Sequence, residues 1–146
     1  MLPPREQGDF GERAALHWLT GRGAHVSIPF GHSPAYDLIA DLGGELSRVQ
    51  VKTSTCRYKD RWAVTVCTRG GNQSWSGLVK RLAPADFDHL FVIVGDGRQW
   101  FIPADRVEGG TAIHLGGPKY AGFEVEPGDP IPETRDRGPS LQSSSA

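Results

Sequence analysis

The spacing of apolar and polar positions in the first half of the chain predicts one helix followed by four strands. Residues 5–20 have the spacing of an amphipathic helix that stops at Gly21. The pair Gly43-Gly44 separates two alternating segments, as a β-hairpin turn does. We expect strands from Val26 to about Pro29, over 36–41, over 46–53 and over 62–68.

The second half of the chain contains a continuous apolar run, Leu90 to Val94, which is typical of a central strand buried on both faces. Residues 72–83, before that run, have little periodicity, and we interpret them as a loop with a short helix. After the run we expect a turn at 95–97, a strand over 99–102, a short helix opened by Pro103 and a last edge strand over 111–115.

These elements predict the α/β (α+β) class, with the first helix packed on one face of a mixed sheet. From Pro127 the chain is rich in Pro, Gly and Ser and buries too little apolar surface to order itself. We therefore expect a domain over residues 1–126 and a flexible tail over residues 127–146.

Length and composition agree with one folded domain that is not inserted in a membrane. The chain has 146 residues, enough to bury a core. No apolar segment approaches the length of a membrane span, and the N-terminus lacks the apolar region of a signal peptide, so we expect a cytoplasmic protein. Cys56 and Cys67 lack the spacing of a zinc site.

Basic residues are concentrated in one segment although the formal net charge is only −1. Between Arg48 and Arg69 there is one acid, Asp60, among six basic residues: Arg48, Lys52, Arg57, Lys59, Arg61 and Arg69. A local basic stretch suits a polyanion such as nucleic acid. A solvated strand-loop-strand surface is the alternative.

Polar side chains that could perform chemistry lie on two neighbouring strands. Gln50 and Lys52 share one face of a predicted strand, and Val49 and Val51 share the other. Asp37 lies on the preceding strand across a short hairpin, so its carboxylate can lie beside them. Mg²⁺ commonly uses one or two carboxylates together with waters and phosphate oxygens. A lysine beside such a cation can stabilise charge on a phosphoryl group. The alternative is an ordinary surface pair of Asp37 with Lys52.

Glu12 adds a second acid from the predicted helix. On a helical wheel it lies on the same side as small and apolar residues, so we expect it to converge with Asp37. The alternative is a carboxylate at the edge of the buried face that reaches water or pairs with an arginine.

Several runs of the sequence resemble one enzyme family. They are Gly8-Asp9-Phe10-Gly11-Glu12, Tyr36-Asp37-Leu38-Ile39, Arg48-Val49-Gln50-Val51-Lys52-Thr53 and Asp88-His89-Leu90-Phe91-Val92. Together they resemble the PD-(D/E)XK nuclease superfamily, and within it the small endonucleases associated with bacterial group I introns. The resemblance implies a restriction-endonuclease-like αβββαβ core and Mg²⁺-dependent cleavage of DNA, with Mn²⁺ as an alternative ion.

The resemblance also implies the site. Glu12, Asp37, Gln50 and Lys52 are the catalytic positions, and Glu12, Asp37, Gln50 and Val51 are the metal positions. Most of the superfamily has an acid where this chain has Gln50, while the intron-associated branch is similar in having glutamine. The nucleic-acid-binding positions that we expect are Arg48, Arg57, Lys59, Arg61 and Arg69.

Three functions are compatible with the sequence. The first is a DNA endonuclease, and the second is a nucleic-acid-binding module of the same fold that has lost cleavage. The third is a protein-interaction domain or an unrelated α/β domain, in which Asp37 and Lys52 simply pair. An endonuclease with one site per chain needs at least a dimer to cut both strands at once, so we expect a homo-oligomer.

Overall fold

A helix, a mixed sheet and a smaller sheet are stacked in the computed structural model of the chain, which describes residues 1–31, 35–69, 79–81, 86–108 and 110–133. The elements are α1 (Pro4–Gly21), β1 (His25–Ser27), β2 (Leu38–Leu42), β3 (Glu45–Ser54), β4 (Arg57–Tyr58), β5 (Arg61–Thr65), β6 (Cys67–Arg69), β7 (Val79–Arg81), β8 (His89–Val94), β9 (Gln99–Pro103), η2 (Ala104–Arg106), β10 (Ala112–Leu115), η3 (Pro118–Phe123) and β11 (Glu124–Val125). None of the helices in these ranges has the length and apolar character needed to cross a membrane.

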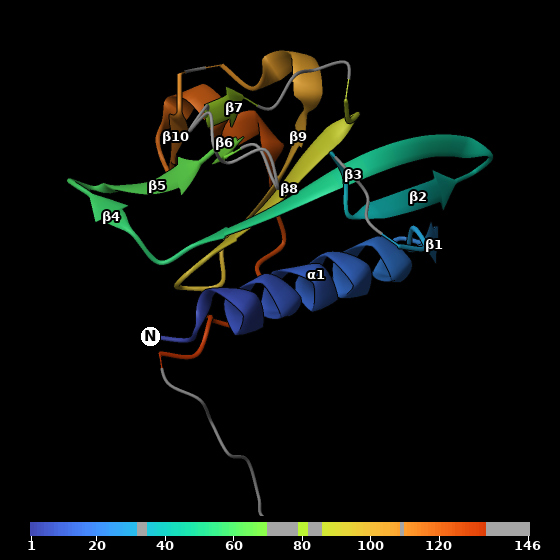
Figure 1. Cartoon of the computed structure of the whole chain (residues 1–146), viewed down its shortest axis with the longest axis horizontal. Coiled ribbons are helices and arrows are strands. Elements are labelled where there is room, and N and C mark those ends of the chain that lie inside the picture. Colours follow the sequence, from blue (N-terminus) through green and yellow to red (C-terminus); the bar gives the residue numbers. More distant parts are fainter. Residues whose placement is uncertain (32–34, 70–78, 82–85, 109, 134–146) are drawn as a thin grey trace, which may run out of the picture.

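The central sheet has the strand order β1-β2-β3-β8-β9-β11. Its strands pair antiparallel except β3 and β8, which pair parallel with Val49 opposite His89 and Ser54 opposite Val94. α1 covers one face of this sheet, and the smaller sheet β10-β5-β4 lies on the other side (Figure 1). The predicted mixed sheet with the first helix on one face is confirmed.

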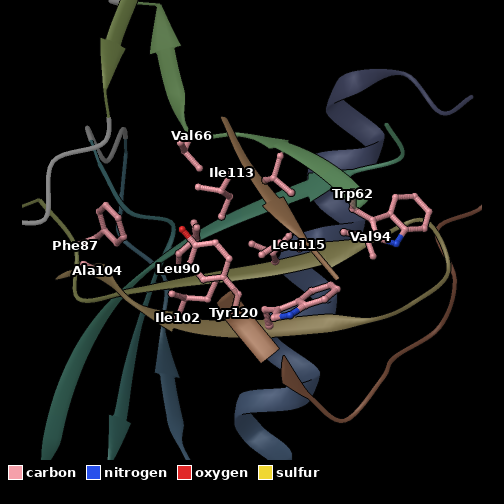
Figure 2. Close-up of a cluster of buried hydrophobic side chains, with 13 residues drawn as sticks. Trp62, Val66, Phe87, Leu90, Val94, Ile102, Ala104, Ile113, Leu115 and Tyr120 are labelled. Atoms are coloured by element: carbon pink, nitrogen blue, oxygen red, sulfur yellow. The ribbon is translucent and has the colours of Figure 1, made fainter. Parts of the chain in front are cut away.

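The core has two parts, one on each side of the central sheet. Against α1, the buried helical positions Gly11, Ala15 and Leu19 recur every fourth residue and face the sheet. On the other side, side chains of β8 and β9 point toward those of β5, β10 and η3, as Figure 2 shows for Leu90, Ile102 and Tyr120. Leu90 to Val94 have 0% exposure, so the predicted doubly buried central strand is confirmed.

Several local predictions are also confirmed. Gly43 and Gly44 form the two-residue turn between Leu42 and Glu45, with positive φ angles of 63° and 88° that glycine tolerates. β9 follows the turn after β8, and Pro103 precedes the short helix η2. β10 is an edge strand, although of the smaller sheet, and it is not the last strand because β11 follows.

Other boundaries differ from the prediction. The first strand ends at Ser27, and β2 begins at Leu38, so Asp37 precedes the strand that was predicted to contain it. The Asp37 N–H still donates to the Val49 carbonyl (2.8 Å), which holds Asp37 beside β3. The segment 62–68 is not one strand, because at Val66 the chain leaves β5, paired with β10, for β6, paired with β7.

Between β3 and β8 the described residues form β4, β5, β6 and β7. Residues 79–81 are a strand and not a loop or helix, because they pair with β6. The other residues of the segment 72–83, which we predicted to be a loop with a short helix, lie outside the described residues.

The predicted start of the tail at residue 127 is wrong for residues 127–133. The Gly128 N–H donates to the Gly97 carbonyl (2.8 Å), and the Ile131 N–H donates to the Gly95 carbonyl (3.1 Å). Ile131 is 4% exposed and belongs to the core beneath α1. These contacts with the β8–β9 turn order a segment whose composition predicts flexibility. Residues 134–146 lie outside the described residues.

The buried segment gives a direct test of the domain boundary. Ile131→Ala removes apolar contacts from a closed core, so we expect the free energy of unfolding to fall by about 2–5 kcal/mol. Leu46→Ala is the control, because Leu46 is 68% exposed, and it should change stability by less than about 0.5 kcal/mol. Urea denaturation measures both. Equal stability of the two variants would place residue 131 outside the folded domain.

Candidate active site

The Asp37 carboxylate is fixed against β3 by two hydrogen bonds. Its Oδ2 accepts from the Val51 N–H (2.8 Å) and from Gln50 Nε2 (3.0 Å). The residue itself is held by its own N–H, which donates to Val49. The acid from the β2 side of the hairpin therefore lies beside the middle of β3, as the sequence predicts.

Gln50 and Lys52 project from one face of β3, opposite the face that packs on α1. Val49 and Val51 belong to the core on the α1 side, where they are 0% and 9% exposed. Gln50 lies opposite Leu90 and Lys52 opposite Val92 in the parallel pair with β8. Both polar side chains therefore lie beside the part of β8, Leu90 to Val94, that is fully buried.

The orientation of the Gln50 amide is set by its neighbours. Nε2 contacts the Asp37 carboxylate and, at 3.4 Å, the Val51 main-chain carbonyl. Both neighbours are acceptors, so the amide must present its NH₂ group to them. The amide oxygen Oε1 is the atom that remains to accept or to bind a cation.

Glu12 enters from the helix. It directly follows Gly11, which is buried against β3, but its own side chain is exposed. Glu12, Asp37, Gln50, Val51 and Lys52 all line one cavity of about 550 Å³. The Glu12 carboxylate thus lies at the edge of the buried face, where it reaches water, and it also borders the cavity that contains Asp37.

The pKa of both carboxyl groups is raised, and burial is the largest cause for each. Burial raises the pKa of Asp37, while the Val51 N–H and the charge of Lys52 oppose that rise. Burial is also the main cause of the raised pKa of Glu12, followed by the negative charges of Asp37 and Asp9. Such a pair of acids is more stable when a cation lies between them.

The available ligands match a hard divalent cation. Glu12 and Asp37 offer carboxylate oxygens, Gln50 an amide oxygen and Val51 a main-chain carbonyl, and Mg²⁺ prefers oxygen ligands with few carboxylates. Within the described ranges there is no cluster of three or more His, Cys, Asp and Glu side chains suited to a metal. A soft, thiolate-dependent or histidine-rich centre is therefore not formed by these residues.

The predicted nucleic-acid-binding residues lie in three parts of the fold, which are β3, the β4–β5 hairpin and β6. Arg48 is paired with Asp88, with Nε–Oδ2 at 3.1 Å, and the Arg48 N–H donates to the same carboxylate. This pair connects β3 to the start of β8 and holds the pKa of Asp88 below its usual range, mainly through the side-chain hydrogen bond. Arg48 therefore stabilises the sheet, and its charge is already balanced.

The hairpin formed by β4 and β5 carries three of the other basic residues. The Arg57 guanidinium lies over the Trp62 ring (4.5 Å to the centroid), and Lys59 Nζ lies over the Tyr58 ring (5.5 Å). Arg61 pairs with Asp60 (2.6 Å). This hairpin is part of the smaller sheet, and β4 is an edge strand of that sheet (Figure 1). Arg69 lies in β6, where only the main chain is described.

The sequence analysis assigned no role to two residues that connect α1 to β3. Gln7 Nε2 donates to Thr53 Oγ1 (3.1 Å), which connects the first turns of α1 to β3. Gly11 lies against Thr53 and Val51. Only the occurrence of a glycine within a helical pattern could have indicated this close approach, and nothing in the sequence indicates the role of Gln7.

Comparison with known proteins agrees with this geometry. A sequence profile of the family described as PD-(D/E)XK endonuclease matches residues 3–117. A solved structure of a bacterial homing endonuclease, I-Ssp6803I, is similar over 84% of this chain and 89% of that chain, with a TM-score of 0.71 and 24% sequence identity. The predicted restriction-endonuclease-like fold is confirmed. No curated protein matches the chain.

The raised pKa of Glu12 gives a pH-dependent prediction. Because the pKa of Glu12 is raised in the folded protein, its ionisation disfavours folding as pH rises above the ordinary value of about 4.3. We expect Glu12→Gln to be slightly more stable than wild type at pH 7 in EDTA and equal to it near pH 3. Saturating Mg²⁺ should reverse the order, because wild type gains more from the cation. Urea denaturation under these conditions measures each difference.

Glu45→Gln is a matched control, since Glu45 is an exposed acid at the far end of the β2–β3 hairpin. It should respond to Mg²⁺ as wild type does. The same response in Glu12→Gln would show that Glu12 does not contribute to cation binding.

Proposed function

We propose that this chain, which belongs to the PD-(D/E)XK endonuclease family, is a divalent-cation-dependent endonuclease that hydrolyses phosphodiester bonds of DNA in the cytoplasm. The observation that carries the proposal is the cavity that joins Glu12 and Asp37 to Gln50 and Lys52. An acid pair, a neutral oxygen and a lysine around one opening are the groups that metal-assisted phosphodiester hydrolysis uses.

Glu12, Asp37, Gln50 and the Val51 carbonyl would hold the cation. Mg²⁺, or Mn²⁺ in its place, supplies a positive charge that polarises the phosphoryl group and activates water. The β3 strand fixes the relative positions of these groups, because the Val51 N–H bonds to Asp37 while the Val51 side chain packs beneath α1. A preorganised site of this kind costs little reorganisation during the reaction.

Lys52 has a separate role in this proposal. Its ammonium group lies on the same face of β3 as Gln50, and its positive charge lowers the pKa of Asp37. From this position it can stabilise negative charge that develops on the phosphoryl oxygens or orient the attacking water. Its contribution would be greatest in the transition state, so its loss should affect rate more than binding.

The alternative is a nucleic-acid-binding module without cleavage. Gln50 favours this alternative, since a neutral amide is a weaker ligand than the carboxylate that most of the superfamily has there. Its Nε2 donates to Asp37 in the structure, so only the neutral amide oxygen Oε1 is left for a cation. Cleavage assays with and without a divalent cation distinguish the two functions.

DNA binding is assigned to the β4–β5 hairpin. The loop from Thr55 to Cys56 and the strand residues Ala63 and Thr65 line the same cavity as the acids, so the hairpin begins at the candidate site. Arg57, Lys59 and Arg61 on this hairpin would contact phosphates beside the bond that is cut. Arg48 makes a weaker candidate because Asp88 balances it. Cutting both strands at once would require at least a dimer, so we propose a homo-oligomer.

The first test is Lys52→Ala. The side chain lies on the face of β3 away from the Val49 and Val51 packing, so its loss should leave the fold intact. We expect the rate of plasmid nicking under single-turnover conditions with Mg²⁺ to fall about 10²–10³-fold. DNA affinity measured in EDTA should change little. Lys119→Ala, which removes an exposed lysine paired with Glu108 (3.1 Å), should cut as wild type does.

Two results would decide against the proposal. Nicking by Lys52→Ala at the wild-type rate would place the activity elsewhere. Wild-type protein that binds DNA but cuts it with neither Mg²⁺ nor Mn²⁺ would favour the binding module instead.

The second test concerns the hairpin. If its basic side chains contact phosphates, binding should weaken steeply as salt increases. Arg57→Gln and Lys59→Gln should weaken binding to all DNA sequences alike, and each should reduce the salt slope by about one. The effect of Arg61→Gln should be smaller, because Asp60 already neutralises that charge. Fluorescence anisotropy in EDTA over a salt series gives these slopes without cleavage.

Arg22→Gln provides the matched loss of one charge. Arg22 directly follows α1 and lies 3.8 Å from Glu126, on the helix side of the central sheet. Its salt slope should equal that of wild type. A hairpin variant with an unchanged slope would remove that residue from the proposed DNA contact.

A further inference from the structure

We infer that Gly11 is a positioning residue, whose missing side chain lets α1 approach β3 closely enough to bring Glu12 to Asp37. This inference rests on the proposed function, because it concerns how the same cation site is assembled. It assigns a role in that assembly to a residue with no functional group of its own.

The contact at Gly11 leaves no space for a side chain. A Cβ atom at this position would lie 3.2 Å from Val51 Cγ1 and would overlap Thr53 Cγ2. Both neighbours are β3 side chains that point toward α1. The separation of helix and strand at this point is therefore set by the absence of a Cβ atom.

Conformational freedom does not explain this glycine. Gly11 lies in the interior of α1, does not have a positive φ angle, and occupies a position where alanine is the better helix former. Gly8, one turn earlier, provides the contrast, because a Cβ atom there would meet nothing within 4 Å. Close approach to β3 is the property that distinguishes Gly11.

The residues around Gly11 are those that build the site. Thr53, which Gly11 touches, also accepts the hydrogen bond from Gln7 (3.1 Å), one helical turn before Gly11. Val51, which Gly11 also touches, donates its N–H to Asp37 (2.8 Å). The same residue of β3, Val51, therefore contacts the helix through its side chain and holds Asp37 through its main chain.

Glu12 directly follows Gly11, so any outward movement of the helix moves its carboxylate away from the cavity. A cation site loses affinity when its ligands are displaced by more than about 0.5 Å. A methyl group at position 11 must therefore either displace Thr53 and Val51 or lift α1. Both responses separate the carboxylates of Glu12 and Asp37.

The test is Mn²⁺ binding by the full chain, followed by isothermal titration calorimetry. We expect Gly11→Ala to bind Mn²⁺ about tenfold more weakly than wild type, in the range that supporting residues of metal sites show. Gly8→Ala makes the same chemical change in the same helix and should bind as wild type does. Circular dichroism confirms that each variant is folded at the temperature used.

A second substitution tests the cause. Thr53→Ser removes Cγ2, the atom that a Cβ at position 11 would overlap, and keeps the hydroxyl that accepts from Gln7. We expect Gly11→Ala combined with Thr53→Ser to regain most of the lost Mn²⁺ affinity. If Gly11→Ala alone does not fold, the combined variant carries the test, and weak Mn²⁺ binding by that folded variant would overturn the inference.

A double-mutant cycle tests whether Gly11 acts through Glu12. In a Glu12→Gln background, Gly11→Ala should cause no further loss of Mn²⁺ affinity. An equal loss in both backgrounds, or wild-type affinity in Gly11→Ala alone, would overturn the inference. So would the absence of Mn²⁺ binding by the wild-type chain.

Cleavage separates this inference from the proposed function. Raising the Mn²⁺ concentration should restore nicking by Gly11→Ala, because only cation occupancy is impaired, and should not restore nicking by Lys52→Ala. Wild-type protein that binds Mn²⁺ but does not cut DNA would end the proposed function, while the binding measurements would still decide the role of Gly11.

Discussion

The register in which β3 pairs with β8 determines both the core and the candidate site. Val49 lies opposite His89 and Lys52 opposite Val92 in this parallel pair. Because side chains alternate along a strand, a shift of one residue would turn Gln50 and Lys52 toward α1 and expose the valines. The burial of β8 on both faces makes such a shift costly, so the packing of the core fixes the orientation of the polar residues.

Where local pattern and tertiary packing agree, the sequence was a sufficient guide. A strand that is apolar on both faces, such as Leu90 to Val94, is buried completely only in the middle of a sheet. Gly43 and Gly44 supply the positive φ angles of a tight turn. The break at Val66 and the ordering of residues 127–133 depend on distant partners, Thr111 for Val66 and the β8–β9 turn for Gly128 and Ile131. Composition and periodicity do not contain such contacts.

The same distinction applies to the candidate site. Alternation along β3 predicted the shared face of Gln50 and Lys52, and the short hairpin predicted the nearby position of Asp37. Charge counting, in contrast, grouped Arg48 with the hairpin residues, although Asp88, forty positions later in the chain, takes up that charge at 3.1 Å. The helical wheel placed Glu12 beside the small and apolar residues of the helix, but it could not show that the Glu12 side chain is exposed while the adjacent Gly11 is buried.

Gln50 illustrates how the site can be stable before a cation arrives. Its Nε2 donates to Asp37 Oδ2 at 3.0 Å, so the amide partly satisfies a half-buried carboxylate. A glutamate in this place would set a third negative charge beside Asp37 and Glu12, and each would raise the pKa of the others. Such a site would depend more strongly on bound cation for its folding free energy. In the proposed cation site, the Gln50 amide would therefore be a weaker ligand than a carboxylate but would stabilise the cation-free protein, and Lys52 would add to that stability through its charge.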